Sequence, residues 1–228
     1  MSAQPFRRPL PRRALLSAAA LLPLGACSAA RLLDPGAPPR LYTLSPAREF
    51  AAGLPRVDWQ LVVETPLANT GIDTGRIALG ETPARLTYYA DCAWVDTAPE
   101  MVQLLLVESL ENSNRIVAVG VEASGLRSDF VLKSDLRDFQ AEYNGGSPDS
   151  SAPEAHVRLN AKLVRMPRRN IVASDTFEAR VAAKSASFDH VIAAFDQALD
   201  MVLRRTVEWT LRQGAANAAQ APLPTASR

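Results

Sequence analysis

Two cysteines and two histidines are the residues of this 228-residue chain whose side chains most often carry nucleophilic, general-base or metal-binding chemistry. His156 falls on the polar side of an alternating pattern, and His190 falls in the first turn of a helical pattern. We interpret both as surface residues. The sequence shows no His/Cys cluster at metal-ligand spacing, no nucleophile elbow and no glycine-rich phosphate loop. We therefore predict that the chain is not an enzyme and needs no metal or other cofactor.

Cys27 has the context of a nucleophile that accepts lipid. It follows Leu24–Ala26, whose small last residues let the backbone enter a narrow protease site. Residues 14–24 form an apolar run, which is far shorter than the roughly 20 residues that a membrane-spanning helix needs. A basic head precedes this run, with arginines at positions 7, 8, 12 and 13. Basic head, short apolar run and small residues before cysteine are the parts of an export signal.

This pattern resembles the lipobox of bacterial lipoproteins. It predicts that residues 1–26 are a signal peptide, and that Cys27 then carries a covalent diacylglycerol and an N-linked acyl chain such as palmitate. An ordinary secretory signal with a chance cysteine is the alternative. The pair Arg12-Arg13 leaves both the general and the twin-arginine export routes open. Ser28 stands where aspartate would resemble an inner-membrane retention signal, which favours the outer membrane.

The remaining composition bounds the mature chain. Loss of the four leader arginines takes the formal net charge from +1 to −3, so no basic balance points to nucleic acid. Cys92 is then the last free thiol and cannot form an intrachain disulfide. We predict that it is a small buried apolar residue.

The chain divides into a tether, one domain and a tail. Residues 27–40 are rich in Pro and Gly and lack periodicity, which predicts a flexible tether behind the lipid. Residues 41–213 are predicted to be one domain. Residues 214–228 are predicted to be a disordered tail, with Gly214 ending the last helix. The Gly- and Ser-rich residues 144–153 predict a surface loop.

Apolar periodicity within the domain predicts strands and two helices. Period-2 alternation is clearest over 157–163 and 171–181, which the turn at 166–170 should join as a hairpin. A long strand over 130–143 loses its apolar phase between Leu136 and Phe139, which predicts a β-bulge there. Shorter strands are predicted at 41–44, 59–63, 77–79 and 86–90.

Two segments have helical spacing. Thr97 and Glu100 form a capping-box pattern ahead of residues 101–110. A longer amphipathic helix begins at Phe188 and has Ser187 as its predicted cap. These elements predict an α+β fold with a single, mostly antiparallel sheet and two helices packed on one face.

The chain resembles the ABC-type transport auxiliary lipoprotein family, which includes the PqiC-like lipoproteins. Leu41–Leu44, Gly71–Ile77 and Leu86–Trp94 are similar to the family's signatures and occur in the family's order behind the lipobox. Cys92 departs from the pattern, because the family usually has a bulkier or charged residue near that position.

The resemblance implies a docking role in transport rather than a reaction. It implies an accessory lipoprotein, anchored in the outer membrane on its periplasmic face, that serves an ABC permease and ATPase. Their further partner would be a mammalian-cell-entry (MCE) domain protein, and the cargo would be phospholipids or other hydrophobic molecules. Related members suggest a homo-oligomer. The alternative is a structural or assembly lipoprotein of the envelope without a transporter partner.

Five residues are candidates for partner contact. Tyr88, Tyr89 and Trp94 lie where a strand leads into the first helix, and there they serve either core packing or an aromatic contact surface. Arg168 and Arg169 lie at the predicted hairpin tip, where they would meet an acidic partner or lipid headgroups, or simply solvent.

Overall fold

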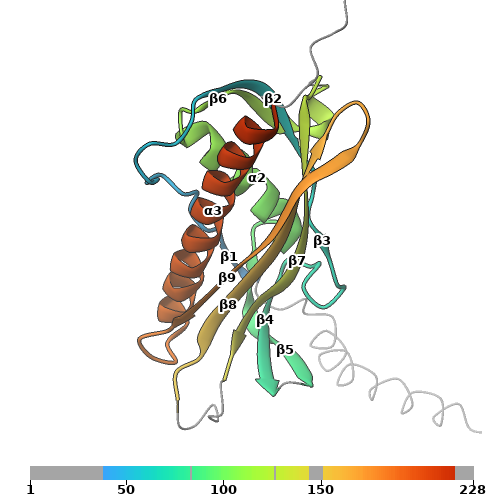
Figure 1. Ribbon diagram of the computed structural model, residues 1–228. Coiled ribbons are helices and arrows are strands. Elements are labelled where there is room, and N and C mark those ends of the chain that lie inside the picture. Colours follow the sequence, from blue (N-terminus) through green and yellow to red (C-terminus); the bar gives the residue numbers. More distant parts are fainter. Residues whose placement is uncertain (1–37, 83, 126, 144–150, 219–228) are drawn as a thin grey trace, which may run out of the picture. The chain divides into compact units, whose positions relative to one another are not determined.

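A computed structural model describes residues 38–82, 84–125, 127–143 and 151–218 (Figure 1). The predictions for the signal peptide, for Cys27, for most of the tether and for residues 219–228 fall outside these ranges. None of the helices in the described ranges combines the length and the apolar character needed to cross a bilayer.

The described chain forms nine strands, two α-helices and a short 3-10 helix (η2) (Figure 1). In chain order they are β1 (Arg40–Tyr42), β2 (Val57–Val63), β3 (Leu67–Ala68), β4 (Arg76–Thr82), β5 (Arg85–Trp94), α2 (Ala98–Asn112), β6 (Ile116–Val121), η2 (Glu122–Ser124), β7 (Phe130–Glu142), β8 (Glu154–Arg165), β9 (Asn170–Ala182) and α3 (Phe188–Ala218).

Strand β7 organises the sheet. One of its edges pairs antiparallel with β8, which pairs antiparallel with β9. Its other edge pairs in parallel with β2, β3 and β4, each along a different stretch of β7. Strands β1 and β5 are also parallel, as are β2 and β6. The sheet is therefore mixed. The α+β class is confirmed, whereas the prediction of a mostly antiparallel sheet is wrong.

Both helices cover one face of the sheet, as predicted. Helix α3 packs on β8 and β9, and α2 packs on β6 and touches α3 (Figure 1). Between them the core is filled by aromatic rings. Trp94 lies 5.6 Å from Phe139 and 5.4 Å from Phe195, measured between ring centroids. The alternating apolar positions of β8, such as Leu159 and Leu163, are fully buried against this core.

The predicted bulge and the first helix cap are present. The register of β7 against β8 shifts between Leu136 and Asp138. Thr97 is the N-cap of α2, and its Oγ1 accepts a hydrogen bond from the Glu100 amide at 3.5 Å. The reciprocal bond of a capping box is absent, because the Thr97 amide donates instead to Asp96 Oδ1 at 2.8 Å.

Helix α3 begins at Phe188 as predicted, but its end differs from the prediction. At its start, Ser187 contributes its backbone carbonyl, which accepts from the amides of His190 and Val191. At its end, the helix continues through Gly214 to Ala218. The prediction that Gly214 ends the last helix is therefore wrong. Gly214 is needed inside the helix, because an added Cβ would lie 2.1 Å from Trp59 Cζ2.

Candidate functional site

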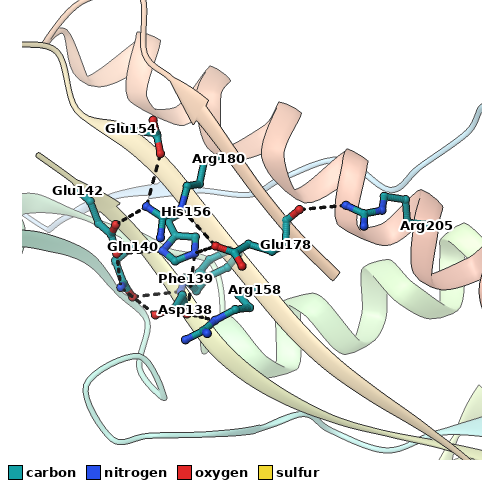
Figure 2. A network of polar contacts seen from close by, with 10 residues as sticks. All are labelled: Asp138, Phe139, Gln140, Glu142, Glu154, His156, Arg158, Glu178, Arg180 and Arg205. Carbon is teal, nitrogen blue, oxygen red and sulfur yellow. Dashed lines mark hydrogen bonds and ion pairs between the residues drawn. The ribbon is translucent and has the colours of Figure 1, made fainter. Parts of the chain in front are cut away.

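The sheet face that turns away from α2 and α3, here called the outer face, carries cross-strand pairs of charged and polar residues over β7, β8 and β9. Asp138, Arg158 and Glu178 stand opposite one another on successive strands. Because the side chains of cross-strand neighbours share a face, residues of all three strands meet at this point. Figure 2 shows the resulting polar network.

His156 is the centre of this network. Its side chain is directed to the outer face, yet the residue is only 3 % exposed. Nδ1 lies 3.0 Å from Glu142 Oε1, and Nε2 lies 2.9 Å from Glu178 Oε1. A neutral imidazole has one N–H and donates to one carboxylate, whereas the protonated ring donates to both. The interpretation of His156 as a surface residue is wrong, because neighbouring side chains cover it. His190, by contrast, is exposed and contacts Ser185 Oγ.

Two arginines neutralise the carboxylates around His156. Arg180 Nη1 donates to Glu142 Oε2 at 2.9 Å, and Arg180 Nε donates to Glu178 Oε1 at 3.2 Å. Arg158 pairs in the same way with Asp138. The network also reaches the helix layer, since Arg205 of α3 donates to the backbone carbonyl of Glu178 (Figure 2).

The network lowers the pKa of two of its carboxyl groups. Burial raises the pKa of Glu142, but hydrogen bonds from His156, Gln140 and Arg180 outweigh it, so the pKa of Glu142 lies below its ordinary value. The pKa of Glu178 is likewise lowered, because bonds from Arg180 and His156 outweigh burial. The same carboxylates raise the pKa of Arg180 against the effect of its own burial.

A surface cavity of about 510 Å³ lies beside this network, between β7–β9 and the β4–β5 hairpin. Asp138, Glu142 and His156 each present one ligand atom there within 4.8 Å of the others, which is a constellation suited to a metal ion. The residues fit a metal poorly, however. Guanidinium groups already occupy both carboxylates, and a divalent cation would have to displace them.

The network is equally unsuited to acid–base catalysis. Both nitrogens of His156 are engaged by carboxylate oxygens, so neither is left to receive a proton from a substrate. The arrangement joins three strands and one helix electrostatically, and its chemistry is that of a structural clamp.

Register explains why sequence reasoning missed this cluster. The alternation of β8 correctly placed His156 on the polar side, but it says nothing about what covers that side. The cluster could have been located from the pairing of β7 with β8 on either side of residues 144–153. This pairing sets His156 opposite Gln140. Strand alternation then places Asp138 and Glu142, two residues before and after Gln140, on the same face as His156.

The three aromatic candidates all lie on β5, but their side chains contact different neighbours. Trp94 is 2 % exposed and belongs to the core, so of its two predicted roles the structure selects packing. Tyr89 packs edge-on against Phe188 at 5.0 Å, and burial raises the pKa of its buried hydroxyl. Tyr88 is half-buried, with the Arg76 guanidinium 3.8 Å above its ring and its hydroxyl donating to the Gly71 carbonyl.

Cys92, on the same strand, is 5 % exposed, as predicted for a small buried residue. Burial, aided by Asp91, raises the pKa of the thiol and outweighs the opposite effect of Arg40.

Arg168 and Arg169 lie at the turn between β8 and β9, as predicted, and both are exposed. They are not brought together with the aromatic candidates. The structure shows no ion pair for either arginine among the residues it describes.

Acid should weaken the domain through Glu142. Because its folded-state pKa is depressed, its stabilising contribution is complete above the ordinary pKa of 4.5 and is lost as pH falls through the lower folded value. We expect the free energy of unfolding of Glu142→Gln to fall less than that of the native domain between about pH 5 and pH 3. Urea denaturation at several pH values measures both slopes. Equal slopes would show that Glu142 is not held in the ionised form.

Three comparisons with known proteins add to this geometry. The model of a family described as an ABC-type transport auxiliary lipoprotein component matches residues 42–207. A crystal structure of a protein from Xanthomonas campestris is similar to the chain, with a TM-score of 0.74 and 34 % sequence identity, over 79 % of this chain and 99 % of that one.

Two further matches are more distant. A crystal structure of an uncharacterised protein shares the fold, with a TM-score of 0.59 and 13 % identity, over 76 % of this chain and 99 % of that one. An uncharacterised protein of Bradyrhizobium diazoefficiens is 25 % identical over 174 residues. That match covers 75 % of this chain but only 44 % of the relative, so the relative is a longer protein.

Proposed function

The chain belongs to the family of ABC-type transport auxiliary lipoprotein components, and from this premise we propose that it is the docking component of a lipid-moving transport system. In this proposal the acyl chains on Cys27 hold it in the outer membrane, on the periplasmic face. Its partner is an MCE-domain protein with its ABC permease and ATPase. The cargo is phospholipid or another hydrophobic molecule.

The observation that carries the proposal is the family match over residues 42–207. It spans β5, α2, the outer face and α3 as far as residue 207, and it lies behind the cysteine motif at 24–27. The family's description supplies the transport system and the lipid anchor. The MCE partner and the lipid cargo are our extension from the resemblance of the sequence signatures.

Packing favours docking over carriage of lipid by this domain alone. A carrier needs an apolar cavity that shields an acyl chain. In the described part of the chain, the space between sheet and helices is occupied by Phe139, Phe195 and Trp94, which are all 2 % exposed or less. The cavity of about 510 Å³ beside the His156 network lies at the surface and is lined by charged residues such as Arg158 and Glu178.

Lipid anchoring suits a docking component for a physical reason. One acyl chain gives marginal and reversible membrane binding, whereas several chains on one cysteine anchor stably. A tether between anchor and domain then raises the effective concentration of the domain for any partner within its reach.

Co-purification from the native host tests the proposal. The lipoprotein, tagged after Arg228, is solubilised in mild detergent and its bound proteins are identified by mass spectrometry. We expect an ATPase, a permease and an MCE-domain protein to be enriched over the same preparation from a host that carries the untagged protein. Recovery of other envelope proteins without any ABC component would instead support the structural or assembly alternative.

A further inference from the structure

One row of the outer face is apolar, although the rows beside it are polar. Val62, Val131, Val164 and Ile171 stand opposite one another across β2, β7, β8 and β9. The following rows along the same face are Lys133–Lys162–Ser174, Asp135–Asn160–Thr176, Asp138–Arg158–Glu178 and Gln140–His156–Arg180. Nothing in the packing of α2 or α3 requires apolar residues here, because the helices cover the other face.

The three valines of the row line a surface cavity of about 230 Å³. They are 3 to 7 % exposed and form an apolar cluster separate from the main core, with Met166 packed against it. Ile171 continues the row at its β9 end and is 61 % exposed. Pockets for whole drug-sized ligands measure about 300–1,000 Å³, so a cavity of this size suits a single apolar side chain.

The charges around the cavity are arranged asymmetrically. The rim on the β2–β7 side contains Glu122 and an ion pair between Lys133 and Glu64 at 2.5 Å. The β8–β9 side is lined by Arg169, which follows Arg168, and neither arginine has an ion pair among the described residues. Arginine beside an apolar pocket is a composition enriched at the energetic centres of protein interfaces.

The backbone at the hairpin also departs from the common pattern. Arg169 has a φ of 57°, in the left-handed region that residues other than glycine, asparagine and aspartate seldom adopt. Such conformations gather at sites where the position of a side chain matters.

We propose that the row Val62–Val131–Val164–Ile171, together with Arg168 and Arg169, is a docking site for a segment of a partner protein that presents an apolar side chain next to acidic residues. The apolar side chain fills the cavity, and the acids face the two arginines. The inference rests on the docking role proposed above and assigns the surface that performs it.

The rim explains why a protein segment fits better than a membrane surface. A uniformly anionic headgroup layer would meet Glu64 and Glu122 as well as the arginines. A peptide can place its acidic residues on the arginine side alone, where charge is complementary.

Photo-crosslinking in the native host tests the site. A benzoylphenylalanine replaces Ile171 in the full lipoprotein, and crosslinked peptides are sequenced by mass spectrometry after irradiation. The exposure of Ile171 makes this change tolerable to the fold. We expect one dominant partner protein, crosslinked through a segment in which an apolar residue has Asp or Glu within a few positions. The matched control places the same crosslinker at Leu67, which is 74 % exposed on β3.

Charge reversal completes the test. The combined change Arg168→Glu and Arg169→Glu should reduce the crosslink at residue 171 by about tenfold. Arg48→Glu, an exposed position in the segment between β1 and β2, should leave it unchanged. Crosslinks only to lipid or to a second copy of this chain, equal capture at residue 67, or insensitivity to the reversal would each overturn the inference.

The outcome also separates this inference from the proposed function. If the crosslinked partner has the expected acidic segment but belongs to no transport system, the docking site is supported and the transport role is rejected. If the transporter co-purifies but no protein is crosslinked at residue 171, the transport role is supported and the docking site is rejected.

Discussion

Gly214→Ala is expected to lower the free energy of unfolding of the domain by about 2 kcal/mol, within the range for overpacked cores. In an isolated helix the same change would stabilise by about 1 kcal/mol. Here the new Cβ would lie 2.1 Å from Cζ2 and 2.8 Å from Cε2 of Trp59. Trp59 has little room to withdraw, because it is 5 % exposed and packs against Phe130 with ring centroids 5.0 Å apart. The steric term therefore outweighs helix propensity.

Urea denaturation measures this effect. Gln213→Ala, one residue earlier on α3 and outside the contact with Trp59, should change the free energy of unfolding by less than about 0.5 kcal/mol. Adding Trp59→Leu to Gly214→Ala should cost less than the two changes would cost separately, since the smaller side chain removes the clash. A higher midpoint for Gly214→Ala alone would contradict the contact.

Cys27→Ser is expected to reduce lipid attachment to background. In the proposed lipidation the thiol is the nucleophile that takes the diacylglyceryl group, and a serine hydroxyl is a far weaker nucleophile near neutral pH. The protein should then accumulate as an unprocessed precursor or as a soluble periplasmic form. Labelling with palmitate in the native host, followed by membrane fractionation, measures both consequences.

The second cysteine provides the control. Cys92 is buried within β5, so Cys92→Ala should leave labelling at the native level. Normal palmitate labelling of Cys27→Ser would refute the lipid anchor. Co-purification of the proposed ABC components with the domain should also fall in Cys27→Ser, because the anchor would no longer concentrate the domain beside its partner.

The sequence predicted those parts of the fold that local patterns determine. The strands of the β8–β9 hairpin appear in the sequence as an alternation of apolar and polar residues. The bulge in β7 appears as an interruption of that alternation. The parallel pairs were not predictable in this way. Strand β6 has six small or apolar residues without alternation, and its partner β2 lies more than fifty positions earlier. Pairing at such separation leaves no local signal.

The candidate site was predictable only in part, for a related reason. The location of Arg168 and Arg169 at the hairpin tip was predictable, because the residues at 166–170 are typical of a turn. The proximity of Arg169 to Val62 and Val131 depends on the register of three strands from different parts of the chain. The prediction for the end of α3 was wrong for another reason. Glycine commonly follows the last residue of a helix, but Gly214 lies within α3, where the bulk of Trp59 leaves no room for a Cβ.

The position of β7 has a consequence for how an exported chain matures. Strands β2, β3 and β4 each find a partner on β7, which lies downstream of them all. If the chain takes the general export route, on which it crosses unfolded from the N-terminus, these segments emerge first and remain without β7 until residues 130–142 have crossed the membrane. Although β2 can pair with β6 and β4 with β5, the edges that later meet β7 stay open at this stage, and a chaperone of the receiving compartment can bind them. Truncations before β7 should therefore be degraded rather than folded.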